Sequence, residues 1–282
     1  MDAWHIVCLL NFERADAYSA SSQNAGQNCI GIERLLVHRD QYGEIYELIS
    51  DRVRGLRIGG ALSADDVGTG VDVGSMISRE RFQNLQDILE AAERQGAHIE
   101  VGGKAREHPY LVNGAFFEPT VIGDVRRDMD IAQQEREFCF CIRPELPMNA
   151  LLDIVFAPIA LVIPYDTIEE AIEIANDSRY ALGASVFGPD KYECLDVAKK
   201  LECGMVSIND FGVFYVRVRE VVRDVSLTQS TAEVCHTTVD MRCIVLPLIP
   251  LSPHSQDLPF GGTKASGYGR FGQCNFFDTY VL

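Results

Sequence analysis

The 282-residue sequence is short of basic residues and of long apolar runs. It has 25 lysines and arginines against 41 acidic residues, for a net charge of −16. Because a surface of that charge repels phosphate backbones, nucleic acid is excluded as a partner. A helix needs about 20 apolar residues to cross a bilayer, and the longest apolar candidate, Ile244–Leu251, is shorter and contains two prolines. We therefore expect no membrane span.

The sequence also lacks a signal peptide and a metal-binding cysteine pattern. Met1–Leu10 has neither a basic start nor a small-residue cleavage site. Among nine cysteines, Cys139 and Cys141, like Cys235 with His236, do not have the paired C-x₂₋₄-C spacing of zinc sites. We expect a cytoplasmic protein with reduced thiols and no metal.

Apolar periodicity alternates between helix-like and strand-like segments, which predicts an α/β fold with a mostly parallel sheet flanked by helices. Residues Arg79–Gln95 predict a helix with one apolar face. Its inward residues are Phe82, Leu85, Ile88, Leu89 and Ala92. Thr167 and Glu170 have capping-box spacing for a helix through Asn176, and Asp190 could begin the next helix in the same way. Buried strands are predicted at Ile159–Ile163, Gly183–Phe187 and Met205–Ile208.

One cysteine, Cys29, lies among small, polar and backbone-permissive residues in the run Asn24–Glu33. Gly26 allows a tight turn, so that amide N–H groups near the thiol can point to where an oxyanion would form. That placement is typical of a nucleophile. The alternative is a small buried hydrophobe, which is how most cysteines outside disulfides behave.

Several motifs follow Cys29 in the order found in one enzyme family. The run Asn24–Glu33 resembles the active-site cysteine motif of the NAD(P)-dependent aldehyde dehydrogenase superfamily, Met129–Glu135 resembles its cofactor-gripping glutamate motif, and Phe156–Pro158 resembles the segment after that. The series continues with Ile163–Thr167, Glu169–Ser178, Leu182–Phe187, Ser207–Asn209 and Pro259–Gly267. Because ordered motifs are far more specific than one motif, the chain is identified as a member of this family, with its catalytic-domain fold.

The resemblance implies oxidation of an aldehyde to a carboxylic acid with NAD or NADP. Cys29 would add to the aldehyde carbon to give a thiohemiacetal, then a thioester that water hydrolyses. Glu135 would accept hydrogen bonds from the nicotinamide ribose hydroxyls, and Phe156 would lie beside that ribose. Without the family, Glu135 would be interpreted as a solvated surface charge and Phe156 as core.

Asn209 follows the apolar run Met205–Ile208, at a strand end where α/β proteins often build sites. The interpretation we favour is a turn residue that holds the backbone through its side-chain amide. The glycine-rich segment Pro259–Gly262 is expected, by resemblance, to close the catalytic domain near the substrate tunnel.

The resemblance divides the chain unevenly. Residues 22–272 would form the catalytic domain, interrupted by irregular insertions at 136–154 and 216–255, while 1–21 and 273–282 match no family motif. Structureless insertions of that length are uncommon in compact domains. Both insertions are either retained non-coding sequence from an error in the gene model or genuine loops.

Parts of the family's active site are absent from this sequence. A Rossmann domain, which supplies the general base and an oxyanion asparagine, precedes the cysteine in the family, but the residues before Cys29 carry no such motif. The C-terminal strand through which the family oligomerises is absent too. We expect an incomplete, weakly active or inactive dehydrogenase. The alternatives are a catalytically dead fragment and a cofactor-independent thiol esterase.

Overall fold

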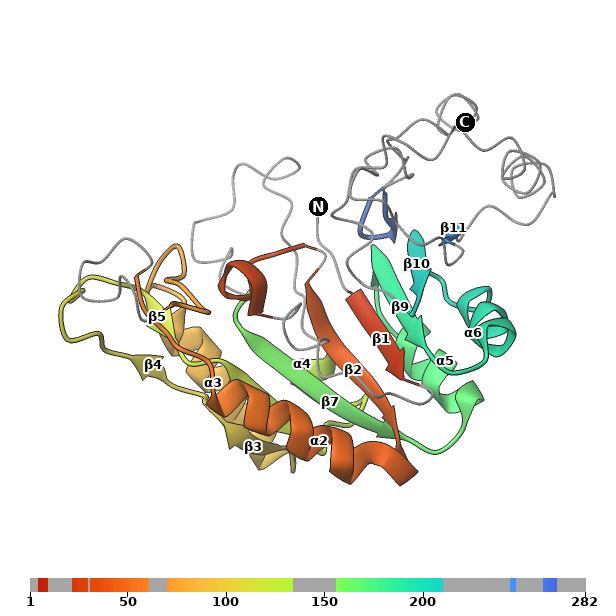
Figure 1. The fold of residues 1–282 in the computed structure, drawn as a ribbon, viewed down its shortest axis with the longest axis horizontal. Coiled ribbons are helices and arrows are strands. Elements are labelled where there is room, and N and C mark those ends of the chain that lie inside the picture. The colour runs from red at the N-terminus through yellow and green to blue at the C-terminus, as the bar shows by residue number, and fades with distance from the viewer. Residues whose placement is uncertain are drawn as a thin grey trace.

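The computed structural model describes residues 5–9, 22–29, 31–60, 70–133, 156–209, 244–246 and 261–267, with the backbone alone at 5–9 and 244–246. Its centre is an eight-stranded sheet in the order β11-β10-β9-β1-β2-β7-β6-β3 (Figure 1). The strands are β1 (His5–Leu9), β2 (Ile32–His38), β3 (His98–Val101), β6 (Thr120–Gly123), β7 (Ile159–Tyr165), β9 (Gly183–Phe187), β10 (Met205–Ile208) and β11 (Ile244–Leu246). All neighbours are parallel except β3 and β6. The predicted mostly parallel α/β sheet is confirmed.

Besides the large sheet, the described residues form helices and two short antiparallel ladders. The helices are η1 (Gln23–Gly26, a 3₁₀ turn), α2 (Arg39–Arg54), α3 (Phe82–Arg94), α4 (Asp130–Gln133), α5 (Ile168–Asn176) and α6 (Lys191–Ala198). The ladders pair β4 (Ala105–Arg106) with β5 (Phe116–Phe117), and β8 (Tyr180–Ala181) with β12 (Thr263–Lys264). No helix within the described ranges has the length and apolar character that a membrane crossing requires.

The three predicted helices form, and α5 and α6 have the predicted caps, while α3 begins at Phe82 rather than Arg79 and has no side-chain cap. The five apolar residues expected to face inward from α3 are all buried. At α5 the Thr167 hydroxyl accepts a hydrogen bond from Glu170 N at 3.2 Å, while the Glu170 carboxylate reaches one residue further back, to Asp166 N. At α6 the Asp190 carboxylate accepts from the amide nitrogens of the first turn. These caps satisfy amide donors that no helical carbonyl can reach.

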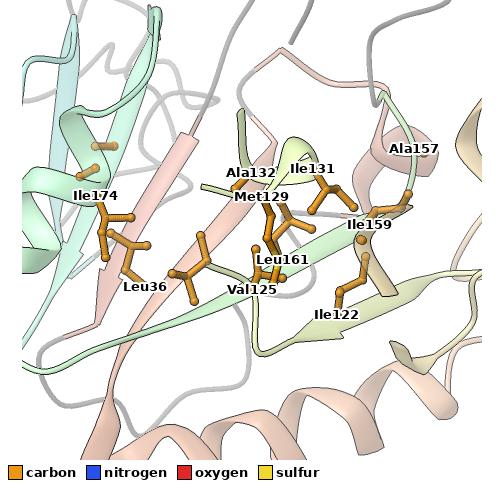
Figure 2. Packing of buried hydrophobic residues seen from close by; sticks show 14 of the residues in the cluster. Leu36, Ile122, Val125, Met129, Ile131, Ala132, Ala157, Ile159, Leu161 and Ile174 are labelled. Atoms are coloured by element: carbon orange, nitrogen blue, oxygen red, sulfur yellow. The ribbon is translucent and has the colours of Figure 1, made fainter. Parts of the chain in front are cut away.

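Both faces of the sheet are covered, because successive residues of a strand point to opposite faces. In β2, Leu35 and Val37 pack with Ile45 and Ile49 of α2, which crosses one face of the sheet in Figure 1. Leu36 points to the other face, where α3, α4 and α5 supply the covering side chains. Figure 2 shows residues of this second core, among them Leu36, Ile122, Val125, Met129, Ile131, Ile159, Leu161 and Ile174.

Two strands lie in segments where no family motif was found. β1 is inside residues 1–21, yet it pairs with β2 on one side and β9 on the other, in the middle of the sheet. β11 is inside the insertion predicted at 216–255 and pairs with β10. The remainder of that insertion, all of 136–154 and the tail 273–282 lie outside the described residues. The domain boundaries therefore stay a prediction.

The parallel strands define two edges of the sheet. We call the end at which they begin the amino edge; His5, Ile32, Gly183 and Met205 stand in register there. The opposite end is the carboxyl edge. The two edges carry different candidate residues.

Candidate active site

Cys29 lies at the amino edge, in the loop between η1 and β2. A backbone hydrogen bond from Gly31 N to Asn28 O, 2.9 Å long, closes a turn around it. Its side chain is half-buried, whereas the two other thiols of the described residues, Cys194 and Cys203, are buried. Burial raises the pKa of the Cys194 thiol to about 11, which makes it a poor nucleophile. Of these three thiols, Cys29 is the accessible one.

The backbone before Cys29 is held in an uncommon conformation. Asn24 and Ala25 have φ angles of 53° and 54°, and Gly26 has 73°. L-residues with side chains rarely adopt this left-handed region, and only glycine does so without strain. Hydrogen bonds stabilise the turn: Gln27 N donates to Asn24 O at 3.1 Å, and Asn24 Nδ2 donates to Gln27 O at 3.0 Å.

Gly26 brings the Cys29 loop against the segment that precedes β7. A Cβ atom at Gly26 would lie 2.0 Å from the carbonyl oxygen of Ala157 and 2.5 Å from Pro158 N. Only a residue without a side chain allows this backbone approach. Phe156, which is half-buried, immediately precedes Ala157 in that segment. Two of the three predicted site residues, Cys29 and Phe156, therefore lie on adjoining segments at the amino edge.

The third predicted residue, Glu135, lies outside the described residues. The part of its motif that is described is well anchored: Met129, Ile131 and Ala132 are buried beneath the sheet, and α4 ends two residues before Glu135. Gln133 Nε2 donates to Arg127 O at 2.8 Å. The roles of Cys29, Glu135 and Phe156 remain predictions.

Asn209 lies at the carboxyl edge, away from Cys29. Its Nδ2 donates to Gly188 O at 2.9 Å and its Oδ1 accepts from Gly188 N at 2.8 Å, while its own φ is 54°. The side chain thus prolongs the pairing of β9 and β10 beyond their last residues. The interpretation as a turn residue that holds the backbone is confirmed.

The glycine-rich segment near the end of the chain returns to the amino edge. A Cβ atom at Gly204 would lie 1.9 Å from the carbonyl oxygen of Gly261. Lys264 Nζ donates to the carbonyls of Asn176 and Ser178, at 2.8 Å and 3.1 Å, and pairs with Glu202. Residues 261–267 are therefore fixed at the same edge of the sheet as Cys29.

Sequence reasoning did not find two residues near Cys29. Gln27 contacts a segment fifty residues away, and nothing in the local sequence indicates that contact. Glu33 is an acid inside the apolar strand β2. An acid in an apolar run is unusual, and this feature of the sequence could have indicated a buried carboxyl. It is the extra residue where the register of β1 and β2 shifts, a β-bulge.

Glu33 is buried, and its Oε1 atom has no hydrogen-bond partner among the residues that the structure describes. Burial raises the pKa of this carboxyl to about 8, against the opposing effect of the Arg34 charge. The Arg34 side chain itself is fully buried and donates to Ile174 O and Ala175 O at 2.9 Å and 3.1 Å, at the end of α5. A buried carboxyl with a raised pKa therefore lies close to the start of β2.

Comparison with known proteins decides the family. The model of the aldehyde dehydrogenase family matches residues 12–138 and 146–220. The chain belongs to the aldehyde dehydrogenase family. The match takes in 12–21, 136–138, 146–154 and 216–220, which the motifs alone left outside the family-like segments.

Curated relatives of this aldehyde dehydrogenase chain are longer than it. An aldehyde dehydrogenase-like protein of Schizosaccharomyces pombe is 35% identical over 88% of this chain and 36% of its own length. The betaine aldehyde dehydrogenase of Bacillus subtilis is 31% identical over 71% of this chain and 36% of its own length. The chain thus spans about a third of the length of the curated relatives it matches.

Solved structures confirm the aldehyde dehydrogenase fold. A betaine aldehyde dehydrogenase from Staphylococcus aureus, solved in complex with NAD+, superposes with a TM-score of 0.68 at 27% identity. The alignment covers 99% of this chain and 43% of that one. An aldehyde dehydrogenase of Mycobacterium tuberculosis complexed with NAD+ gives a TM-score of 0.67 at 25% identity, over 98% and 44% of the two chains.

Proposed function

We propose that this chain forms the thiol-bearing part of an NAD(P)-dependent aldehyde dehydrogenase, with Cys29 as the nucleophile. The observation that supports this most is the placement of the thiol. It is half-buried, on a closed turn at the amino edge, beside the Phe156–Pro158 segment that Gly26 brings into contact. Accessible thiols on turns with nearby amide donors suit nucleophilic attack on a carbonyl carbon.

The chemistry assigned to Cys29 begins with addition of its thiolate sulfur to the aldehyde carbon. A carbon–sulfur bond forms, and the carbonyl oxygen becomes the oxyanion of a thiohemiacetal. Backbone amide groups of the turn are suited to hold that oxyanion. Loss of hydride from the same carbon leaves a thioester on Cys29. Water then attacks it, the carbon–sulfur bond breaks, and the carboxylic acid leaves with the thiol restored.

The cofactor class is assigned from the family, because the similar solved structures were determined in complex with NAD+. NAD or NADP, when bound, accepts the hydride. Phe156 fits a position against its ribose, because this aromatic ring is half-buried on the segment that adjoins the Cys29 loop. Glu135 is assigned the role of accepting hydrogen bonds from the ribose hydroxyls, since a carboxylate can accept from both hydroxyls of a diol. The substrate is assigned as an aldehyde of unspecified structure.

We further propose that the 282-residue chain by itself oxidises aldehydes weakly or not at all. It spans about a third of the length of its curated relatives, and the family resemblance implies that the general base and an oxyanion asparagine belong to a domain that precedes the cysteine. Thiol acylation by an activated ester requires less, because it needs the nucleophile and an oxyanion site but no hydride acceptor.

The test is acylation of the purified chain by 4-nitrophenyl acetate. Attack by the Cys29 thiolate forms a thioester and releases 4-nitrophenolate, whose absorbance is followed, while peptide mass spectrometry locates the acetyl group. We expect a burst of one equivalent at Cys29 that is absent from Cys29→Ser. Cys194 and Cys203 are internal controls, since both are buried and should remain unmodified.

The dehydrogenase part is tested by NAD(P)H formation with a panel of aldehydes. Acylation of Cys29 without NAD(P)H formation is the expected result. Rapid NAD(P)H formation would establish the dehydrogenase and contradict the proposed weakness of the isolated chain. Acylation at Cys194 or Cys203 in preference to Cys29 would contradict the assignment of Cys29 as the nucleophile. Turnover of the ester that continues after the burst would favour a cofactor-independent thiol esterase.

A further inference from the structure

Gln27 ties the Cys29 loop to a segment fifty residues further along the chain. Its Oε1 atom accepts a hydrogen bond from Ile77 N, and its Nε2 atom donates to Asn24 O, both at 3.0 Å. Both ends of one amide are thus in use, one inside the loop and one outside it. Distances of 3.0 Å are those of well-formed hydrogen bonds.

The segment that receives Gln27 is itself fixed. Met76 N donates to Ala115 O at 2.7 Å, and Ser75 Oγ accepts from Ala115 N at 2.9 Å. Met76 is buried in the core beneath the sheet. The Ile77 side chain, by contrast, is 88% exposed, so what this residue offers the loop is its N–H group.

The thiol stands between two fixed points that are close together. Gln27 is two residues before Cys29, and β2 begins three residues after it. Between them, the hydrogen bond from Gly31 N to Asn28 O closes the turn. A short turn between two anchors has little freedom, so a shift of either anchor is transmitted to the thiol.

We infer that Gln27 is a positioning residue for the Cys29 thiol and that the Ile77 N–H is its anchor. This inference rests on the proposed function of Cys29. A reacting group displaced by about 1 Å can lose about 100-fold in rate, because the attack geometry and the oxyanion contacts must be met together. Loss of one hydrogen bond at this loop should therefore slow acylation without unfolding the chain.

The test compares two ways of breaking the same hydrogen bond in the full chain. Gln27→Ala removes the acceptor, and Ile77→Pro removes the donor, because proline has no N–H. Ile77→Ala is the matched control, since it keeps the N–H and removes only the exposed side chain. Gln83→Ala is the second control, because Gln83 donates to Asp87 on the exposed side of α3, at 2.9 Å. The rate of Cys29 acylation by 4-nitrophenyl acetate is measured for each variant.

We expect Gln27→Ala and Ile77→Pro each to slow acylation about tenfold or more, with both controls at the wild-type rate. The double variant should be no slower than Gln27→Ala alone, because Gln27→Ala already removes the interaction that Ile77→Pro removes. Gln27→Glu keeps an acceptor for Ile77 N but cannot donate to Asn24 O, so it should acylate faster than Gln27→Ala and more slowly than the wild type. A residue with a general structural role would show neither the rescue nor the non-additivity.

Circular dichroism melting curves check that each variant is folded. If one of Gln27→Ala and Ile77→Pro unfolds, the other still decides, because each breaks the hydrogen bond between Ile77 N and Gln27 Oε1, and an unchanged acylation rate in the folded variant would contradict the anchor. Wild-type acylation at Cys29 with an unchanged rate in Gln27→Ala would overturn this inference alone. Absence of acylation at wild-type Cys29 would overturn the proposed nucleophile and this inference with it.

Discussion

At the amino edge of the sheet, segments approach each other backbone to backbone, whereas at the carboxyl edge polar side chains close the gaps between strands. Glycines permit the approaches at the amino edge. A Cβ atom would lie 2.0 Å from a carbonyl oxygen at Gly26, 2.2 Å at Gly102 and 1.9 Å at Gly204. Side chains cannot occupy such spaces, so main-chain groups meet there.

The carboxyl edge is closed by side chains of three kinds. The Asn209 amide binds both backbone groups of Gly188. The Arg39 guanidinium pairs with the Asp166 carboxylate across the ends of β2 and β7, and holds the pKa of that carboxyl below its usual range. Asp124 N, just after β6, donates to Tyr42 Oη at 2.6 Å.

The two edges of the sheet therefore differ in the kind of interaction that fixes their loops. Backbone contacts through glycine fix loops tightly while leaving a thiol such as Cys29 partly exposed between them. Polar side chains at the other edge satisfy the last backbone groups of the strands and fill the surface. Structural interactions therefore dominate the carboxyl edge, and the candidate nucleophile Cys29 lies beside a backbone contact, at Gly26, from which side chains are excluded.

The strongest test of the amino edge is Gly26→Ala. The new methyl group would overlap the Ala157 carbonyl, and alanine would have to adopt a φ of 73°. We expect a loss of more than about 3 kcal/mol in the free energy of unfolding, measured by urea denaturation, together with loss of Cys29 acylation.

Gly43→Ala is the matched control for that experiment. Gly43 lies within α2, and a Cβ atom there would meet no atom within 4 Å. Alanine should stabilise the helix by about 0.5–1 kcal/mol. If Gly26→Ala were as well tolerated as Gly43→Ala, the backbone contact would not define the amino edge.

A second test concerns the buried carboxyl of Glu33. Its pKa is about 8 in the folded chain and near 4.5 when unfolded, so the folded state binds more protons between these values. Stability should therefore fall as the pH rises through that window. Glu33→Gln removes the titration, and we expect it to stabilise the chain at pH 8 by on the order of 4 kcal/mol.

Melting temperatures of wild type and Glu33→Gln, taken from pH 4.5 to 8, measure this difference. The two curves should converge at the acidic end and separate as the pH rises. Glu44→Gln, at an exposed position of α2, should follow the wild type throughout. A constant offset between wild type and Glu33→Gln at every pH would contradict the assignment of the titrating group.

The smallest expected effect is at the carboxyl edge. Asn209→Ala loses the two hydrogen bonds to Gly188 and leaves alanine at a φ of 54°. We expect a loss of about 1 kcal/mol in stability by urea denaturation. Acylation of Cys29 should keep its wild-type rate, because the two residues lie at opposite edges. A slower acylation would show that the edges are coupled.

Much of the fold could be predicted because the elements concerned depend on residues that are close together in the sequence. The helix over α3, the Thr167 cap of α5 and the strands β7, β9 and β10 depend on side-chain periodicity and on residues within one turn. β1 was not predicted as part of the sheet, since its place between β2 and β9 is set by partners far away in the sequence.

The candidate site was predicted in part for the same reason. The residues around Cys29 indicate a turn, and the motif order indicates the family, which the comparisons confirm. The contact between Gln27 and Ile77 could not be predicted, because it joins residues fifty positions apart through a single amide. Glu33 was overlooked because its burial depends on the sheet and on the helix packed against it.

By itself, the sequence determined the family, the α/β class and the identity of the candidate nucleophile, since motifs and periodicity are properties of neighbouring residues. Only the tertiary structure decided that the segments bearing Cys29 and Phe156 meet at one edge while Asn209 lies at the other. It also decided that Gly26 must lack a side chain and that burial raises the pKa of Glu33. Each of these depends on the distance between atoms from separate segments, which packing sets and no local pattern encodes.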